Sequence, residues 1–174
     1  MKHDNSEELF PIVDCEGNVR GCASRGVCHG GSKLLHPVVH LHLINKYGEV
    51  YLQKRPEWKD IQPGKWDTAV GGHVDYGEET EEALYREVWE EIGLTRFSPE
   101  YIKSYVFESD REREYVNVYA AVSNEVPSPS DELEEGKFWS IAEIEASLGK
   151  GIFTPNFESE FAGVLKPWLV SCNS

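Results

Sequence analysis

Three glutamates at helical spacing carry the clearest chemical signal in this sequence. Glu87, Glu90 and Glu91 lie at positions i, i+3 and i+4, so in a helix their side chains fall within an arc of roughly 100° and project to one side. Like charges at these spacings repel each other, and anions near the C-terminal end of a helix are destabilising by ~0.3–1 kcal/mol each. A cation such as Mg²⁺, which binds carboxylate oxygens and keeps several waters, would offset that repulsion. The pattern therefore indicates either a solvated acidic face or a metal site.

A helix over residues 79–92 is predicted to hold these glutamates. Leu84, Val88 and Ile92 recur every four residues and form its buried stripe. Glutamates crowd the first turn, where the helix dipole favours anions. Gly93 follows the last apolar position, as a left-handed cap commonly does.

The residues around these glutamates resemble the Nudix box. Gly72 is followed after five residues by Glu78, and after seven more by the segment 86–94, which reads REVWEEIGL. The box consists, in order, of a glycine, a spaced glutamate, Arg-Glu, an aliphatic residue, Glu-Glu, a glycine and an aliphatic residue. The segment fits it at every constrained position.

That resemblance implies an α+β fold, namely an α/β/α sandwich with a mixed central sheet and a loop–helix–loop motif that carries the metal. It implies a Mg²⁺- or Mn²⁺-dependent hydrolase that cleaves a diphosphate linkage in a nucleoside diphosphate derivative or a similar small organic diphosphate. The implied metal ligands are Glu87, Glu90 and Glu91, and Arg86 would orient a glutamate through a salt bridge. The implied structural residues of the motif are Gly72, Glu78 and Gly93.

The reaction of that family fits the chemistry of these side chains. A bound metal ion neutralises diphosphate oxygens and lowers the pKa of a water, and a glutamate then takes the proton. The glutamate with this role varies within the family. The first candidates lie in the box itself, and the next are Glu112 and Glu114.

Segments outside the box resemble type I isopentenyl-diphosphate isomerases more loosely, from about residue 8 to residue 167. The matching segments are residues 8–36, residues 63–67 followed by 72–73, and residues 131–132 leading to 138–139. Those isomerases bind a metal through three histidines and two glutamates. The corresponding residues here are His29, His36, His73, Glu112 and Glu114.

The resemblance to the isomerases therefore implies a second divalent site of mixed imidazole and carboxylate character. Glu112 and Glu114 are separated by one residue, so on a strand both would point to the same face. Without the resemblance, each lone histidine is more often structural or solvated, because a motif needs its context.

One departure from the isomerase pattern decides between the two activities. The isomerases place an essential cysteine just before the Gly-His step, and this chain has Gly71 there. Without the thiol, a proton shuttle across an alkene lacks one of its two partners. The sequence therefore favours a hydrolase over an isomerase. A third alternative, a module that binds nucleotides without cleaving them, is disfavoured because every box glutamate is present.

Substrate contacts outside the metal sites are expected at the end of a predicted strand. Lys54 and Arg55 are candidates to bind phosphate oxygens, since a bidentate arginine suits them, although a solvated strand end explains them equally well. Trp66 could stack on a substrate ring, but packing is the more common fate of a tryptophan beside a strand.

Further elements must position these side chains. We expect an N-terminal hairpin at about 9–23 and strands over 37–43, 50–54, 66–71, 101–108 and 115–122. Apolar residues alternate along 37–43 with His36, His40 and His42 on the even face, which is the period of a half-buried strand. Helices are expected at 79–92, 141–148 and 157–169. Together these elements predict one domain, 1–174, containing the box at 72–94.

Composition excludes several partners. Acidic residues number 31 against 17 basic ones, for a formal net charge of −14, which argues against a nucleic-acid footprint and against binding to an anionic membrane surface. We interpret the acidic run at 131–135 as solvated surface. No apolar stretch is long enough to span a bilayer.

Four cysteines, Cys15, Cys22, Cys28 and Cys172, form no CxxC pair, which predicts free thiols in a cytoplasmic protein and no zinc site by spacing. Dimers are frequent in the family that the box resembles, and the sequence leaves open whether this chain forms a homodimer.

Overall fold

The computed structural model describes residues 6–58, 62–129 and 135–172. Its strands are β1 Leu9–Val13, β2 Val19–Ser24, β3 Leu35–Ile44, β4 Val50–Lys54, β5 Trp66–Thr68, β6 Val70–His73, β7 Glu100–Glu108, β8 Arg113–Val122 and β9 Glu135–Trp139. Its helical segments are α1 Arg25–His29, α2 Thr80–Ile92, α3 Ile141–Ser147, α4 Pro155–Glu160, the π-helical segment η1 Phe161–Leu165 and α5 Lys166–Cys172.

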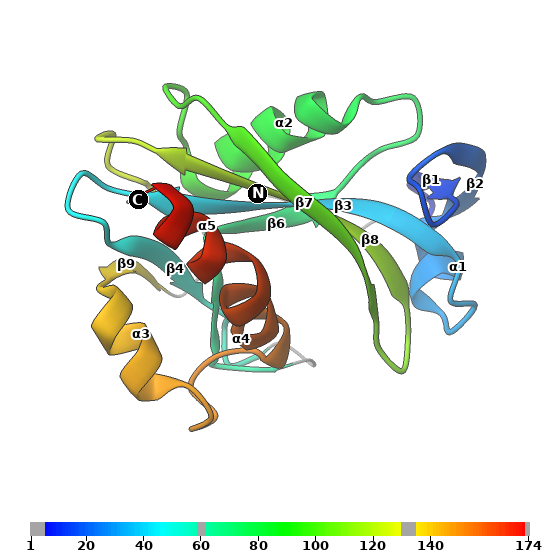
Figure 1. Ribbon diagram of the computed structural model, residues 1–174. Helices are drawn as coiled ribbons and strands as arrows, with labels where there is room; N and C mark the ends of the chain where they lie inside the picture. Colours follow the sequence, from blue (N-terminus) through cyan, green and yellow to red (C-terminus); the bar gives the residue numbers. More distant parts are fainter. Residues whose placement is uncertain (1–5, 59–61, 130–134, 173–174) are drawn as a thin grey trace.

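A mixed sheet forms the middle of the molecule (Figure 1). Its order is β5-β4-β3-β8-β7, with β6 paired to β3 and β9 paired to β4. The β3–β8 pair is parallel, and the other pairs are antiparallel. Strands β1 and β2 form a separate antiparallel hairpin. The predicted α+β fold with a mixed central sheet is therefore confirmed.

Helices cover both faces of the sheet. The apolar side chains of α2 pack with the odd-numbered residues Val39, Leu41 and Leu43 of β3. On the opposite face, η1 packs through Val164 against Val38, Val116 and Val118, while α3 and α4 complete an aromatic cluster around Phe153, Phe157 and Phe161. Figure 1 shows α2 on one side of the sheet and the C-terminal helices on the other. The layers are those of an α/β/α sandwich.

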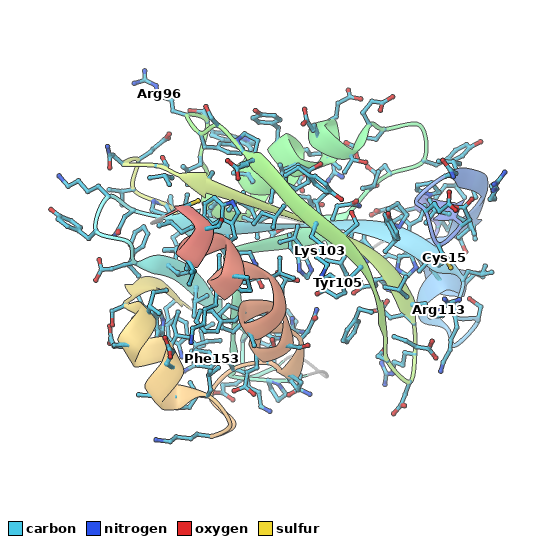
Figure 2. All side chains as sticks on the ribbon, viewed as in Figure 1. Cys15, Arg96, Lys103, Tyr105, Arg113 and Phe153 are labelled. Carbon is cyan, nitrogen blue, oxygen red and sulfur yellow. The ribbon has the colours of Figure 1, made fainter. Side chains whose placement is uncertain are left out.

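Strand β3 differs from the half-buried strand that its alternation predicts. His36 and His42 are fully buried, and His40 is mostly buried. For His40 and His42 the physical reason is Glu160 at the end of α4, whereas His36 is covered by Phe10 of β1. The buried carboxylate of Glu160 accepts hydrogen bonds from His40 Nδ1 at 2.8 Å, from His42 Nε2 at 2.5 Å and from the Tyr105 hydroxyl at 2.5 Å. Because the histidines and the carboxylate satisfy each other's hydrogen bonds, the helices can cover this polar face of β3. Tyr105 of β7 is the fourth residue of this hydrogen-bonded group, and it is labelled in Figure 2.

Other boundaries differ from the sequence prediction as well. The single strand expected at 66–71 is two strands, because 66–68 pair with β4 whereas 70–73 cross over to pair with β3. The closing helix begins earlier than expected and is interrupted by the π-helical segment directly after Glu160. The sequence did not predict α1 or β9. The acidic run at 131–135 lies almost wholly outside the described residues.

Two further expectations concern the whole chain. In the described part of the chain, no helix combines the length and the apolar character that crossing a bilayer requires. The four cysteines are all free, and only Cys28 is buried.

The contact between His40 and Glu160 predicts a loss of stability at alkaline pH. Burial alone would lower the pKa of His40, but the Glu160 carboxylate outweighs burial and raises this pKa from 6.5 to about 9. A histidine whose pKa is higher in the folded state contributes stability that is fully present below about pH 6.5 and is lost as the pH rises to about 9. Between these values, the free energy of unfolding measured with urea should fall by up to ~1.4 kcal/mol per pH unit.

A Glu160→Gln variant is the control for this prediction. It removes the charge that raises the pKa of His40, so its stability should be lower at neutral pH and nearly independent of pH between 6.5 and 9. A wild-type stability that stays flat over the same range would contradict the ion pair.

Candidate active site

Helix α2 places the box glutamates at a fixed position over the sheet. Glu79 caps the helix reciprocally with Glu82, whose side chain accepts from the Glu79 amide at 2.9 Å. At the other end Gly93 adopts φ 65°, the left-handed conformation that glycine tolerates best, and its amide donates to the Trp89 carbonyl. The predicted helix and its glycine cap are therefore confirmed.

One guanidinium connects most of the motif. Arg86 donates two hydrogen bonds of 2.9 Å to the Glu78 carboxylate and one of 2.8 Å to Glu87, and it lies 3.5 Å from Glu90. It also donates to the backbone carbonyl of His73 at 2.9 Å. The hydrogen bonds that Arg86 donates to Glu78 and the charge of Glu87 raise the pKa of Arg86 further above its ordinary value, although burial opposes this. Arg86 therefore fixes Glu78, Glu87 and the strand before the box in one arrangement.

Gly72 is required by the close approach of Glu87. A Cβ atom built on Gly72 would collide with the Glu87 carboxyl group. Glu87 itself is almost fully buried, with 1% of its surface exposed. Only glycine allows that carboxylate to pass over strand β6 and reach Arg86.

The other two box glutamates are more exposed than Glu87. Glu91 Oε1 lies 3.3 Å from the amide nitrogen of Gln53, which also donates to the Thr68 carbonyl. Glu90 is exposed and lies near Arg86. These hard carboxylate oxygens, partly open to water, match the donors that Mg²⁺ or Mn²⁺ takes.

A second polar cluster forms on the opposite side of β6. Its members are His29 at the end of α1, His36 at the start of β3, His73 at the end of β6 and Glu112 just before β8. One ligand atom from each lies within 4.8 Å of all the others. Within the described residues, no other group of three or more His, Cys, Asp or Glu side chains comes together in this way. Glu114 lies at the margin, 4.0 Å from His73 Nε2.

The ring nitrogens of this cluster converge on a common point. His29 Nε2 lies 3.1 Å from His73 Nε2 and 3.1 Å from Glu112 Oε2. His36 Nδ1 lies 3.0 Å from the Leu34 carbonyl, which can only accept, so that nitrogen carries the proton and Nε2 offers its lone pair to the cluster. His36 Nε2 and Glu112 Oε2 are buried and make no hydrogen bond. Buried acceptors of this kind are what a metal ion would satisfy.

Burial sets the protonation of the same groups. It lowers the pKa of His36, which favours the neutral imidazole that binds metals. It also raises the pKa of Glu112, and together with the charge of Glu112 it raises the pKa of Glu114 to about 7. The cluster is therefore short of positive charge, and a divalent cation would stabilise the ionised carboxylates.

The N-terminal hairpin closes this cluster on one side. Phe10 of β1 is fully buried and stacks on His73 with ring centroids 4.6 Å apart and an angle of 3° between the planes. It also stacks on His36 at 5.7 Å. An apolar wall of this kind excludes water and holds the rings in place. Nothing in the sequence marked Phe10 except its place in a predicted strand.

Other expected contact residues lie elsewhere. Arg55 is 3.9 Å from Asp67 and Lys54 ends β4, so neither belongs to the histidine cluster. Trp66 packs edge-on against Trp139 at 5.3 Å, which is the packing role expected for it. Sequence reasoning did not assign Gln53, Tyr105 or Glu160 to the site. Glu160 was detectable in principle, as an acid between the apolar residues of the closing helix.

Comparison with known proteins identifies relatives of both kinds. The NUDIX domain family matches residues 34–157. The chain is similar to an uncharacterized Nudix hydrolase of Streptomyces coelicolor, with 30% identity over 94% of this chain and 91% of that protein. It is also similar to an isopentenyl-diphosphate Delta-isomerase of Pectobacterium atrosepticum, with 30% identity over 90% of this chain and 91% of that protein.

Solved structures share the fold. The crystal structure of DR0079 from Deinococcus radiodurans superposes with a TM-score of 0.71 at 24% identity, covering 84% of this chain and 92% of that one. The crystal structure of a MutT protein from Methanosarcina mazei gives a TM-score of 0.64 at 27% identity, covering 80% and 96%. The predicted likeness to both groups of relatives is therefore confirmed.

The histidine cluster predicts a metal site that can be measured apart from activity. Co²⁺ bound to imidazole and carboxylate gives visible absorption bands whose intensity reports the ligand set. Glu112→Gln and His73→Asn should each weaken Co²⁺ binding by more than about tenfold, because each removes one donor. The matched control is Glu91→Gln, a box variant that should leave these bands unchanged. Equal affinity in all four proteins would show that the cluster holds no metal.

Proposed function

Because this chain belongs to the Nudix family, we propose that it is a Mg²⁺- or Mn²⁺-dependent pyrophosphohydrolase. Its substrate would be a nucleoside diphosphate derivative or a similar small organic diphosphate, cleaved at the diphosphate linkage. The observation that carries the proposal is the intact box, in which Arg86 bonds Glu78 and Glu87 while Glu90 is exposed and Glu91 is partly exposed.

The side chains on both faces of β6 have separate roles in this proposal. Glu87, Glu90 and Glu91 would hold the metal that binds the diphosphate, and Arg86 keeps Glu87 in place. When bound, Mg²⁺ or Mn²⁺ neutralises diphosphate oxygens and lowers the pKa of water. The proton of the attacking water would pass to a glutamate of the box or to Glu114, whose pKa of about 7 suits a base at neutral pH.

Two single-atom replacements test the box. Glu90→Gln and Glu91→Gln keep the shape of the side chain and remove its charge, so each should lower phosphate release by about a hundredfold or more. Phosphate release should be measured with Mg²⁺ and with Mn²⁺, and circular dichroism should show that the fold is kept. Glu125→Gln, at a partly exposed glutamate outside the box whose carboxylate accepts from the Arg96 amide, should retain wild-type turnover. Full activity in either box variant would refute the assignment of that glutamate.

A specific observation also favours a second candidate, isopentenyl-diphosphate isomerisation. His29, His36, His73 and Glu112 come together as the resemblance to the isomerases implies. Gly71, however, places no thiol beside them, and the alkene would lack one of its two proton carriers. Hydrolysis is therefore the function that the site supports better.

Solvent exchange tests the second candidate directly. Isopentenyl diphosphate incubated with the protein in D₂O should acquire no deuterium at its allylic positions, and no dimethylallyl diphosphate should appear in the NMR spectrum. A genuine isomerase run alongside is the positive control. Deuterium uptake that depends on Glu114 would establish the isomerase and displace the hydrolase.

A further inference from the structure

Gln53 interrupts the apolar face of the sheet that packs against α2. Tyr51, two residues earlier on β4, belongs to the apolar cluster that contains Leu84 and Val88 of α2. Residues two apart on a strand point to the same side, so the side chain of Gln53 continues this row. Gln53 is only 8% exposed. The sheet therefore carries a buried amide at a position where an apolar side chain would pack equally well.

The amide nitrogen of Gln53 has two acceptors. Gln53 Nε2 donates to the Thr68 carbonyl of β5 at 3.0 Å and lies 3.3 Å from Glu91 Oε1. A carbonyl oxygen can only accept, so the contact with Thr68 fixes which end of the amide is the nitrogen. The two N–H groups thus connect a fixed point of the sheet backbone with one glutamate of the box.

The other end of the same amide argues against a purely structural role. Gln53 Oε1 is buried, and none of the described residues donates a hydrogen bond to it. Leaving a buried acceptor without a donor destabilises the fold, and an apolar side chain of the same length would avoid that cost. Side chains that break a local rule in this way concentrate at functional sites. The contact made by the amide nitrogen is therefore the reason for a glutamine here.

An uncharged donor suits a carboxylate that must bind a cation. Arg86 bonds Glu87 at 2.8 Å and neutralises its charge. Gln53 carries no charge, so it can orient Glu91 and still leave the negative charge of that carboxylate to a metal ion. Hydrogen bonds from outer residues orient the carboxylates that bind metals, and a carboxylate already held in place loses less side-chain entropy when the metal binds.

We propose that Gln53 is a positioning residue for the metal of the box, and that its amide holds Glu91 in the orientation in which this carboxylate binds the cation. The inference rests on the proposed function, in which Glu91 is a metal ligand. It extends the metal-binding machinery from α2 to β4, with the Thr68 carbonyl as the fixed point.

Mn²⁺ binding, followed by the electron paramagnetic resonance signal of the free ion, tests the proposal without turnover. The box site is the part of the binding that Glu91→Gln removes. Gln53→Met keeps the length of the side chain and removes both N–H donors, so the affinity of the box site for Mn²⁺ should fall about tenfold. Circular dichroism should show that the fold is kept.

Asn117→Leu is the matched control. Asn117 is also 8% exposed, and its amide nitrogen donates to the Val38 carbonyl at 3.1 Å. The variant removes a buried amide from the same sheet but no contact with a box glutamate. Its affinity for Mn²⁺ should stay within about twofold of that of the wild type, as expected for independent sites.

A readout on the wild-type protein covers the case in which Gln53→Met unfolds. Labelling the glutamine side chains with ¹⁵N gives signals from Gln53 and from Gln62, which is the other glutamine of the chain. Addition of Mg²⁺ should shift the Nε2 signal of Gln53, because the ion draws charge from the Glu91 carboxylate that this nitrogen contacts. The signal of Gln62 should stay in place, and the shift should be absent in Glu91→Gln.

The outcomes separate this inference from the proposed function. Unchanged Mn²⁺ affinity in a folded Gln53→Met protein overturns the inference, and so does a Gln53 signal that Mg²⁺ does not shift. An equal loss of affinity in Asn117→Leu also overturns it, because the loss of any buried amide would then suffice. If one of these occurs while Glu90→Gln still abolishes phosphate release, the hydrolase stands without Gln53. Weakened binding in Gln53→Met alone, with no phosphate release from any substrate, supports the inference and refutes the hydrolase.

Discussion

The contact between Arg86 and its carboxylates is the interaction on which the rest of the site depends. Burying the Glu87 carboxylate is costly unless a cation and hydrogen bonds satisfy it, and Arg86 supplies both. Arg86 also donates two hydrogen bonds to Glu78. Because the same guanidinium donates to the His73 carbonyl, it ties helix α2 to strand β6. Gly72 leaves the room that this contact needs.

The four residues of strand β6 separate two groups of polar side chains, one on each face of the strand. Successive residues of a strand face opposite sides, so Gly72 faces α2 and the box, while Gly71 and His73 face the histidine cluster and His40. The box offers hard oxygen donors, and the other side offers imidazoles beside buried carboxylates.

A feature of the fold or the site could be predicted from the sequence where adjacent residues carried the signal for it. The box helix followed from the spacing of Leu84, Val88 and Ile92, and its glycine cap from Gly93, because periodicity and capping are properties of adjacent residues. The clustering of four residues could be predicted only from the resemblance to the isomerases, because they are distant in the sequence: His29, His36, His73 and Glu112. Glu160 pairing with His40 across 120 positions had no local signal, and for that reason β3 was predicted to be half-buried. Strand β6 was joined to β5 because nothing local shows where a chain changes its pairing partner.

The most direct test of the central claim is a screen for ¹⁸O incorporation during turnover in H₂¹⁸O with Mg²⁺ or Mn²⁺. Nucleoside triphosphates, nucleotide sugars, dinucleoside polyphosphates and isoprenoid diphosphates would be the substrates, with mass spectrometry of the phosphate products. The account predicts one ¹⁸O atom in a phosphate product of at least one substrate class, and none when Arg86 is replaced by Leu in a protein that remains folded. Unlabelled products from every class, with conversion of isopentenyl diphosphate to its isomer, would contradict it.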